Sequence, residues 1–390
     1  MKIVLFTHPN FLSSQSMPRF ACMIQQGMQA HGHIVEVWSP EPFFYRFPLS
    51  HRFKKWLGYL DQFIVFPQQV RERLKKLPLD TLFVFSDQAL GPWVPLVVDR
   101  PHVIHVHDFM ALRSSLGEFV QNPMAWSGRQ YQAMIRRGFG QGKAFISVSE
   151  KTYTDLQRFL PSRPQISTVI YNGLNFPFRC MTRSDYLLTL TAAGLVVPKT
   201  GFLLHVGGNQ WYKNRLGVLE IYQAYVRQEE NPLPLWMVGP PPTEFMKSIA
   251  KNIMGKGQVQ FLTGLTNEQV CAAYSAARLM LFPSLAEGFG WPIAEAMACG
   301  CTVLTTGEAP MIEVGGDSAF YIPRRPDNEA GNWAIQAAKQ VGEILVLPLY
   351  DKQLRKEKGF KQIAQFNTEH TMNAYEQIYL QIVSSIKVDK

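Results

Sequence analysis

Two glutamates and a run of glycines stand together in residues 282–303, which read FPSLAEGFGWPIAEAMACGCTV. The apolar run at 279–282 predicts a strand, and the residues that follow the turn predict a helix that opens at Pro292 and that Gly300 ends. The turn between them offers backbone N–H groups at the positive end of the helix dipole, which suits an anion or the hydroxyls of a sugar. The residues expected to form this cradle are Gly288, Phe289, Gly290, Trp291 and Pro292.

The two carboxylates, Glu287 and Glu295, indicate what the cradle would bind. A carboxylate has no packing role in a glycine-rich, hydrophobic turn, whereas the hydroxyls of a sugar and of a ribose are natural hydrogen-bond donors to it. We expect Glu295 to bind ribose hydroxyls and Glu287 to bind a hexose. The alternative is a plain strand–turn–helix joint of the kind that every α/β protein contains.

The string EGFGWPIAEAMACG resembles the Glu-x7-Glu signature of retaining glycosyltransferases of the family 4, or group 1, type. The resemblance implies an α/β chain with the GT-B fold, in which two Rossmann-like domains face each other across a deep cleft. It implies an acceptor-binding domain at residues 1–173 and a nucleotide-sugar-binding domain at 174–368. A C-terminal helix at 369–390 would cross back to the first domain.

A second segment, GGNQWYKN, follows the strand expected at 202–206 and resembles the glycine turn and phosphate-binding lysine of that family. Lys213 is therefore expected to neutralise the diphosphate as it leaves. Gly208 or Asn209 stands where the family usually has an arginine, so that contact is missing or is supplied elsewhere, with Arg215 as the candidate. Two further loops, after the strands expected at 235–238 and 259–262, are implied to form the nucleotide pocket through Gly239, Gly264 and Leu265.

His107 follows the strand expected at 103–106, at the edge where open α/β sheets bind their ligands. The pair His107-Asp108 resembles the His-Asp pair that the family carries opposite the donor sugar, and His105 is the competing assignment. We expect His107 to support the transferred sugar through a hydrogen bond. Residues proposed for the acceptor side are Ser14, Gln15 and Asp108, the first two in a loop where the family has a glycine pair.

The expected catalytic residues are therefore His107, Lys213 and Glu287. The resemblance implies a retaining hexosyltransferase that needs no metal or cofactor, and the chain contains no Asp-x-Asp motif. The nucleotide-diphosphate sugar, with UDP-glucose as our choice, would be the co-substrate, and a glycan or lipid-linked sugar of polysaccharide biosynthesis the acceptor. A nucleotide-sugar 2-epimerase and a non-catalytic nucleotide-sugar-binding protein are the alternatives.

The net charge of +9 is compatible with three kinds of partner: nucleic acid, anionic lipid and anionic small substrates. Aromatic and basic residues alternate through residues 43–76, which favours an anionic membrane surface, whereas a packed aromatic core with solvated charges explains the same pattern. We expect no nucleic-acid partner, because no binding motif accompanies the segment. The start of the chain does not resemble a signal peptide, no apolar run has the length of a membrane span, and the five cysteines show no metal-ligand spacing. These features favour a cytoplasmic protein, peripheral on the inner face of the cell membrane.

Overall fold

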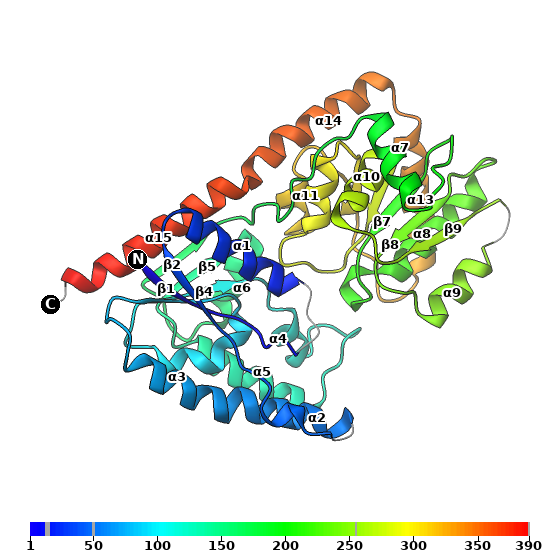
Figure 1. Cartoon of the computed structure of the whole chain (residues 1–390). Helices are drawn as coiled ribbons and strands as arrows, with labels where there is room; N and C mark the ends of the chain where they lie inside the picture. The colour runs from blue at the N-terminus through cyan, green and yellow to red at the C-terminus, as the bar shows by residue number, and fades with distance from the viewer. Residues whose placement is uncertain (12–15, 49–50, 254–255, 389–390) are drawn as a thin grey trace. The chain divides into compact units, whose positions relative to one another are not determined.

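The structure, a computed structural model, describes residues 1–11, 16–48, 51–253 and 256–388. It divides the chain into two compact α/β units (Figure 1). Unit 1 contains Met1–Asn175 and Thr368–Lys390, and unit 2 contains Phe176–Asn367. Unit 1 thus extends two residues beyond the boundary predicted at residue 173, and its last helix begins at Thr368.

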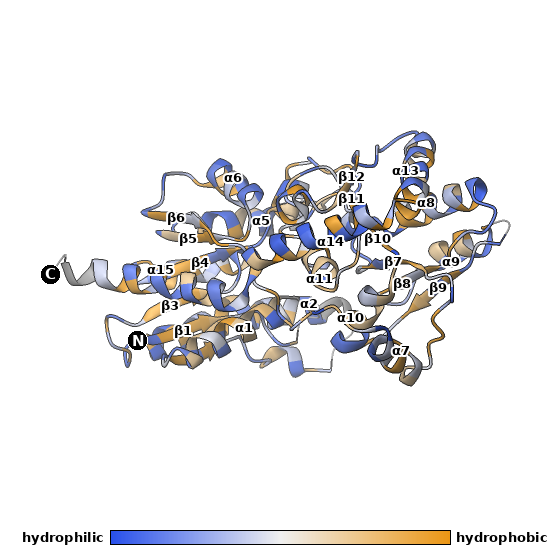
Figure 2. Cartoon of the chain, turned by 90° about the horizontal axis from the view of Figure 1, so that it is seen from above, coloured by the Kyte–Doolittle hydropathy of each residue, from blue (hydrophilic) through white to orange (hydrophobic). Residues whose placement is uncertain are grey.

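Unit 1 is built on a six-stranded parallel sheet with the strand order β2-β1-β3-β4-β5-β6. Its inner strands consist of consecutive buried residues, as expected where helices cover both faces of a parallel sheet, and most strands are orange in Figure 2. The bounds of the strands are β1 Lys2–Phe6, β2 Ile34–Trp38, β3 Leu82–Phe85, β4 His102–Val106, β5 Ala144–Ser147 and β6 Ile166–Val169.

The helices of unit 1 begin and end largely as local signals dictate. Ser149 caps α6 by accepting a hydrogen bond from the backbone N–H of Thr152. The C-terminal helix α15 is held to the unit by Glu376, which binds His31 Nδ1 at 2.9 Å and His33 Nε2 at 2.7 Å. The helical elements are α1 Ser16–Ala30, η1 Phe44–Arg46, α2 His51–Leu60, η2 Asp61–Val65, α3 Phe66–Leu74, η3 Gln88–Leu96, α4 Met110–Ser115, α5 Trp126–Phe139, α6 Glu150–Phe159 and α15 Thr368–Val388.

The aromatic and basic segment at 43–76 is mostly helical and has two sides. Phe66 and Val70 are part of the core, whereas Phe43 and Trp56 are exposed. Buried Asp61 organises the segment by accepting hydrogen bonds from the backbone N–H groups of three consecutive residues, 43–45, at 2.8 to 3.2 Å. The core interpretation is therefore correct for only part of these aromatic residues.

Unit 2 has a second six-stranded parallel sheet with the order β12-β11-β10-β7-β8-β9 and a hydrophobic core of its own. Its strands are β7 Leu203–Val206, β8 Leu235–Val238, β9 Val259–Leu262, β10 Leu279–Phe282, β11 Val303–Thr306 and β12 Phe320–Ile322. Its helical elements are α7 Arg183–Ala192, η4 Trp211–Lys213, α8 Arg215–Gln228, α9 Glu244–Lys251, α10 Asn267–Ala276, α11 Trp291–Ala298, α12 Met311–Gly315, α13 Ala330–Leu345, α14 Leu349–Ile363 and η5 Ala364–Phe366.

Both sheets reverse their strand order at one point, and this decides where ligands can bind. In unit 2 the chain proceeds from β7 outward to β9 and then returns to β10 on the other side of β7. In unit 1 the same reversal separates β1 from β3. Open α/β sheets bind ligands at the carboxyl ends of the strands beside such a reversal. Among the helices of the described ranges, none has the length and apolar character needed to span a membrane.

Candidate active site

Lys213 and Glu287 meet at the strand reversal of unit 2. Lys213 ends the short helix after β7, Glu287 follows β10, and Lys213 Nζ lies 2.7 and 2.9 Å from the two carboxylate oxygens. The two side chains are only 15% and 6% exposed. Ser284 Oγ also donates to Glu287 at 2.8 Å. The structure thus brings together two predicted site residues that are 74 positions apart.

Hydrogen bonds to backbone carbonyl groups fix the two loops that carry this ion pair. The N–H of Leu285 donates to the carbonyl of Tyr212 at 2.7 Å, and Asn214 Nδ2 donates to the carbonyl of Pro283 at 2.8 Å. Asn214 has a left-handed conformation, with φ of +52°, and its side chain also caps α8 by accepting the N–H of Gly217. The lysine and the glutamate are therefore held by the fold and do not depend on each other alone for their positions.

The glycine turn follows directly and leads into α11. Gly290 has φ of +101° and forms the N-cap. The helix begins at Trp291, one residue earlier than predicted, and Pro292 occupies its second position. Gly288 and Phe289 are buried beside it. The predicted strand at 279–282 matches β10, and Gly300, with φ of +74°, follows the C-cap of α11.

Glu295 lies on α11 and is half-buried. Tyr274 donates its hydroxyl to Glu295 Oε2 at 3.0 Å. Burial, and then the neighbouring Glu295 charge, hold the pKa of Tyr274 well above its ordinary value, so the phenol stays a neutral donor. This contact orients the carboxylate that we assign to the ribose.

The loops after β7 and β8 touch at two glycines. Gly239 has φ of +153°, and a Cβ on it would lie 2.1 Å from the carbonyl oxygen of Gly207. Asn209 Nδ2 donates to Pro241 O at 2.8 Å, which ties the same two loops together beside Gly208. Gly264 and Leu265 follow the edge strand β9, where Gly264 is exposed with φ of +72°.

Arg215 lies inside unit 2 and is only 2% exposed. Its guanidinium donates to Asn209 Oδ1 and, at 3.0 Å, to Pro240 O, so it connects the loops after β7 and β8. Both bonds use Nη1, and they hold Asn209 in position. Nε and Nη2 are buried without a hydrogen-bond partner among the described residues, and the phosphate contact suggested for Arg215 stays a prediction.

His205, on β7, is a residue that sequence reasoning missed. Nδ1 lies 2.9 Å from the carbonyl oxygen of Leu281, and Nε2 lies under Gly207, where a Cβ would approach it to 2.8 Å. Burial lowers the pKa of His205 to about 3, so the ring is neutral and donates through Nδ1. The sequence signal for this residue is a histidine within the apolar run at 202–206.

In unit 1, His107 follows β4 and is buried. Nε2 lies 2.9 Å from the carbonyl oxygen of Ser86 and therefore carries the proton, because a carbonyl only accepts. Burial lowers the pKa of His107 even though Asp87 opposes the shift, so the imidazole is neutral and its Nδ1 is an acceptor. The competing His105 is fully buried and contacts the hydroxyl of Tyr379 at 2.7 Å, which indicates a structural role.

His8 and Asp87 stand at the strand reversal of unit 1, after β1 and β3, and were not predicted. His8 Nε2 lies 2.8 Å from Asp87 Oδ2. Burial would raise the pKa of Asp87, but the hydrogen bond with His8 holds it below its ordinary value. Gln88 joins this edge to β4 by accepting the N–H of His107 at 2.9 Å.

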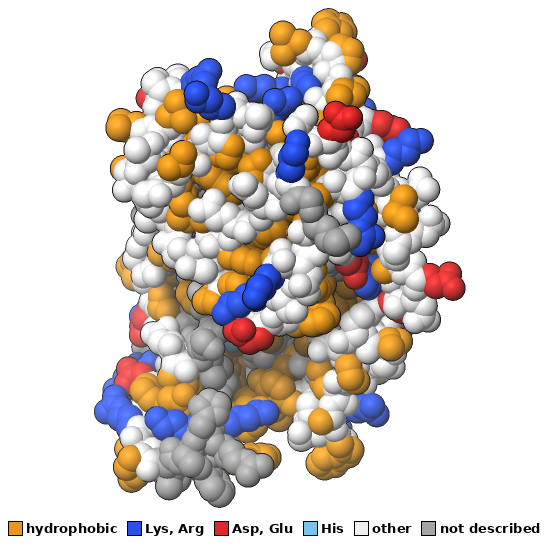
Figure 3. Space-filling view, turned by 90° about the vertical axis from the view of Figure 1, so that its right-hand side faces the viewer, with side chains coloured by type: hydrophobic (Ala, Val, Ile, Leu, Met, Phe, Trp, Pro, Cys, Tyr) orange, Lys and Arg blue, Asp and Glu red, His pale blue; other side chains and the backbone are white. Residues whose placement is uncertain are grey.

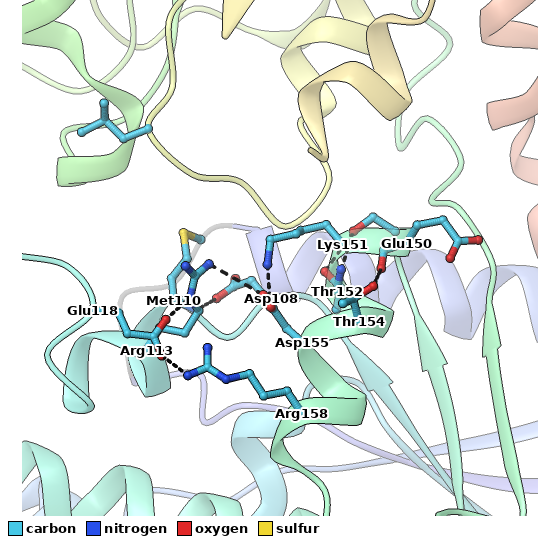
Figure 4. A network of polar contacts seen from close by, with 12 residues as sticks. Asp108, Met110, Arg113, Glu118, Glu150, Lys151, Thr152, Thr154, Asp155 and Arg158 are labelled. Carbon is cyan, nitrogen blue, oxygen red and sulfur yellow. Dashed lines mark hydrogen bonds and ion pairs between the residues drawn. The ribbon is translucent and has the colours of Figure 1, made fainter. Parts of the chain in front are cut away.

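Asp108 Oδ1 accepts the N–H of Met110, the first residue of α4, at 2.9 Å. Figure 4 shows it beside a network in which Arg113 and Arg158 both bind Glu118, at 2.8 and 2.6 Å. The other acceptor-side predictions, Ser14 and Gln15, lie outside the described residues. Within the described ranges, no three His, Cys, Asp or Glu side chains are grouped so that they could hold a metal ion.

Comparison with known proteins gives matches in both units. Residues 17–176 match the family described as Glycosyltransferase Family 4, and residues 192–341 match Glycosyl transferases group 1. O-antigen chain mannosyltransferase B of Escherichia coli is 26% identical over 262 residues, which are 64% of this chain and 64% of that protein. Serotype-specific mannosyltransferase WbdA of Escherichia coli is 34% identical over 127 residues, which are 31% of this chain and 16% of WbdA.

Solved structures align over nearly the whole chain. Sucrose-phosphate synthase from Thermosynechococcus elongatus aligns with a TM-score of 0.75 at 16% identity, covering 99% of this chain and 100% of the other. HepE of Anabaena, in complex with UDP and glucose, aligns with a TM-score of 0.66 at 17% identity, covering 98% and 99%. The likeness extends through both α/β units. The chain therefore belongs to the glycosyltransferases of the family 4 and group 1 type and has their GT-B fold.

Proposed function

We propose that the protein is a retaining hexosyltransferase that moves a hexose from a nucleotide-diphosphate sugar to a glycan or lipid-linked acceptor. The observation that carries this proposal is the Lys213–Glu287 pair at the strand reversal of unit 2, adjacent to the first turn of α11. A fixed ammonium at this position suits a diphosphate leaving group, and the carboxylate suits a hexose hydroxyl.

The chemistry follows from where charge develops. As the bond to the anomeric carbon breaks, negative charge grows on the leaving phosphate, and Lys213 together with the N–H groups at the start of α11 stabilises it. Glu287 accepts hydrogen bonds from the hexose, and Glu295, oriented by Tyr274, accepts them from the ribose. Because Lys213 and the start of α11 supply fixed positive charge to the leaving phosphate, the proposal requires no metal ion.

The proposed retention of configuration requires no strong base on the acceptor side, because the leaving phosphate can take the proton of the attacking hydroxyl. The neutral His107 fits this scheme: its proton is held by Ser86 O, and Nδ1 can accept a hydrogen bond from a sugar hydroxyl. We assign His107 to support of the transferred sugar, not to proton abstraction.

Two donors are candidates. UDP-glucose is the expectation from the sequence, whereas the names of two relatives, both mannosyltransferases, favour a mannose donor such as GDP-mannose. The chain spans 64% of mannosyltransferase B and 16% of WbdA, so their sugar comes to this protein only as part of the proposal.

Incubation with radiolabelled UDP-glucose and GDP-mannose, each with EDTA and with a membrane glycolipid extract, tests the proposal. Label in the lipid fraction, with an α-linked product from an α-linked donor by anomeric proton coupling, is the expected result. A β-linked product would refute retention. A changed sugar without transfer would indicate an epimerase, and binding without turnover a non-catalytic protein.

We also propose that the protein is cytoplasmic and contacts the inner face of the cell membrane through residues 43–76. Trp56, which is 61% exposed, and the adjacent Lys54 and Lys55 support this contact. Figure 3 shows basic and hydrophobic side chains intermingled near its lower end. Charge reversal at Lys54 and Lys55 should weaken vesicle binding, and each basic residue near the surface should contribute about 1 kcal/mol at low salt.

A further inference from the structure

A groove of about 640 Å³ opens on unit 1, and its lining includes none of the residues assigned to catalysis. Its walls are α4, α5 and the end of α6. Leu112, Leu116 and Phe159 supply much of its apolar lining. Neither the sequence signals nor the family matches assign a role to this groove.

Three arginines of α5 line the groove: Arg129, Arg136 and Arg137. They lie on one side of the helix because positions separated by seven and eight residues complete about two turns. The groove lining contains no acidic residue, and neither does α5 itself. The groove therefore concentrates positive charge with no carboxylate in its walls.

Contacts within unit 1 hold two of these arginines in place. Arg136 Nε donates to Phe159 O at 3.0 Å, and its guanidinium lies 5.6 Å from the centre of the Phe159 ring. Arg129 Nε donates to Met124 O at 3.1 Å. Both contacts use Nε, which leaves the terminal nitrogens of each guanidinium for a ligand. The nearby Arg113 and Arg158, by contrast, are both paired with Glu118 (Figure 4).

One exposed apolar side chain lies in the groove lining, and another lies at the start of α5. Leu116, in its lining, is 51% exposed, and Trp126, the first residue of α5, is 75% exposed. Trp126 precedes Arg129 and Arg137 by three and eleven residues, a helical spacing that places all three on one face. Guanidinium groups bind phosphate through two parallel hydrogen bonds, and tryptophan favours the boundary between water and lipid. This combination suits an anionic amphiphile better than a fully soluble anion.

The side of α5 opposite to the groove packs against the segment already proposed to contact a membrane, because Tyr131 stands two residues from both Arg129 and Ala133 of the groove lining. Tyr59 of α2 packs against Tyr131 of α5 with ring centres 5.6 Å apart, and Phe63 packs against the same ring at 6.0 Å. The helix that carries Trp56 and Lys55 therefore lies directly beside the helix that carries the groove. Neither helix has an acidic residue.

We propose that this groove binds the phosphate headgroup of an anionic phospholipid and that α5 is a second membrane contact of unit 1. Arg129, Arg136 and Arg137 bind the phosphate, and Trp126 enters the lipid interface beside it. The proposal rests on the proposed function only because a lipid-linked acceptor gives a reason for membrane contact. Its test does not depend on activity.

The test is sedimentation of the full chain with vesicles of phosphatidylglycerol and phosphatidylcholine, and with pure phosphatidylcholine. The triple variant R129Q/R136Q/R137Q should lose about 100-fold in partition coefficient on the anionic vesicles, from about 1 kcal/mol for each arginine. The matched control K247Q/K251Q/K339Q removes the same charge from helices α9 and α13 of unit 2 and should retain most of the binding.

Single variants keep the result interpretable if loss of the Arg136 contact disturbs folding. Arg137→Gln and Trp126→Ser should each weaken binding to anionic vesicles by several-fold. Equal losses in the two triple variants, or undiminished binding by the groove variants, would refute the site. Tight binding of glycerol 1-phosphate without vesicle binding would show a soluble-anion site instead. Failure of sugar transfer with intact vesicle binding would refute the proposed function alone.

Discussion

At the scale of single residues, the Lys213–Glu287 pair has to serve both the fold and the chemistry. The two side chains are largely removed from water, and removing one partner of such a pair leaves an uncompensated charge. Because negative charge grows on the leaving phosphate, the lysine should stabilise the transition state more than the bound donor. Lys213→Ala should therefore lower kcat by about 100-fold or more, with a smaller change in nucleotide affinity.

Steady-state kinetics and calorimetry of nucleotide binding measure the two effects separately. Lys247→Ala is a suitable control, since Lys247 is exposed and pairs with Glu244 on the same helix. An unchanged kcat in Lys213→Ala, with the fold intact by circular dichroism, would remove the lysine from the mechanism.

His205 makes the stability of unit 2 depend on pH. In the unfolded chain a histidine has a pKa of about 6.5, whereas burial lowers the pKa of His205 in the folded chain to about 3. Between these values the unfolded chain binds a proton that the folded chain does not bind, so stability falls as the pH decreases below about 6.5.

Urea unfolding at pH 7.5, 6 and 5 should therefore show a smaller loss of stability in His205→Asn than in the unchanged protein. The asparagine amide can still donate to Leu281 O but does not titrate. Parallel pH profiles for His205→Asn and the unchanged protein would contradict this role of the buried ring.

At the scale of elements, the contact between the loops after β7 and β8 depends on the absence of a side chain at Gly239. A Cβ there would meet the carbonyl oxygen of Gly207 at 2.1 Å, and φ is +153°. Gly239→Ala should therefore separate the loops and weaken nucleotide binding. Gly194→Ala is the matched control, because φ is +74° but no atom lies within 4 Å of the added Cβ.

Both substitutions should cost the left-handed strain of about 1–2 kcal/mol, and only Gly239→Ala should add steric displacement to it. Chemical unfolding and nucleotide titration of the two variants measure the difference. Equal effects on stability and on nucleotide affinity would show that the glycine contact does not organise the loops.

Elements with strong local signals could be predicted from the sequence. The strands at 235–238, 259–262 and 279–282 agree with β8, β9 and β10, because each is a short run bounded by turn residues. The segment at 43–76 could not be resolved, since its aromatic residues are divided between core and surface. Its organising residue, Asp61, binds backbone groups 16 to 18 positions away, which leaves no local pattern.

Long-range contacts likewise limited what could be predicted of the candidate site. Glu287, Lys213 and the glycine turn could be selected by type and family pattern, but their direct pairing depends on the strand order, which the sequence does not state. His8 and Asp87 were missed because each is unremarkable alone and their contact spans 79 positions. The burial of Arg215 could not be predicted from the sequence either.

At the scale of the whole molecule, the chain contains two sheets with separate cores, and each has its own strand reversal. The predicted donor residues all belong to unit 2, whereas His107 and Asp108 belong to unit 1. A ligand that binds only the folded state stabilises the part that it contacts, by about 2.7 kcal/mol at 100 times its dissociation constant. Donor nucleotide should therefore act mainly on unit 2.

Hydrogen exchange with and without the nucleoside diphosphate of the active donor measures this directly. We expect slower exchange in the loops after β7 and β8 and in the turn before α11, because the nucleotide contacts these backbone groups and suppresses local opening. Helix α5 of unit 1 should exchange unchanged, and adenosine monophosphate at the same concentration is the control ligand. Protection confined to unit 1, or equal protection by both ligands, would contradict the assignment of the donor to unit 2, since in either case the loops around Lys213 and Glu287 would not distinguish the leaving group.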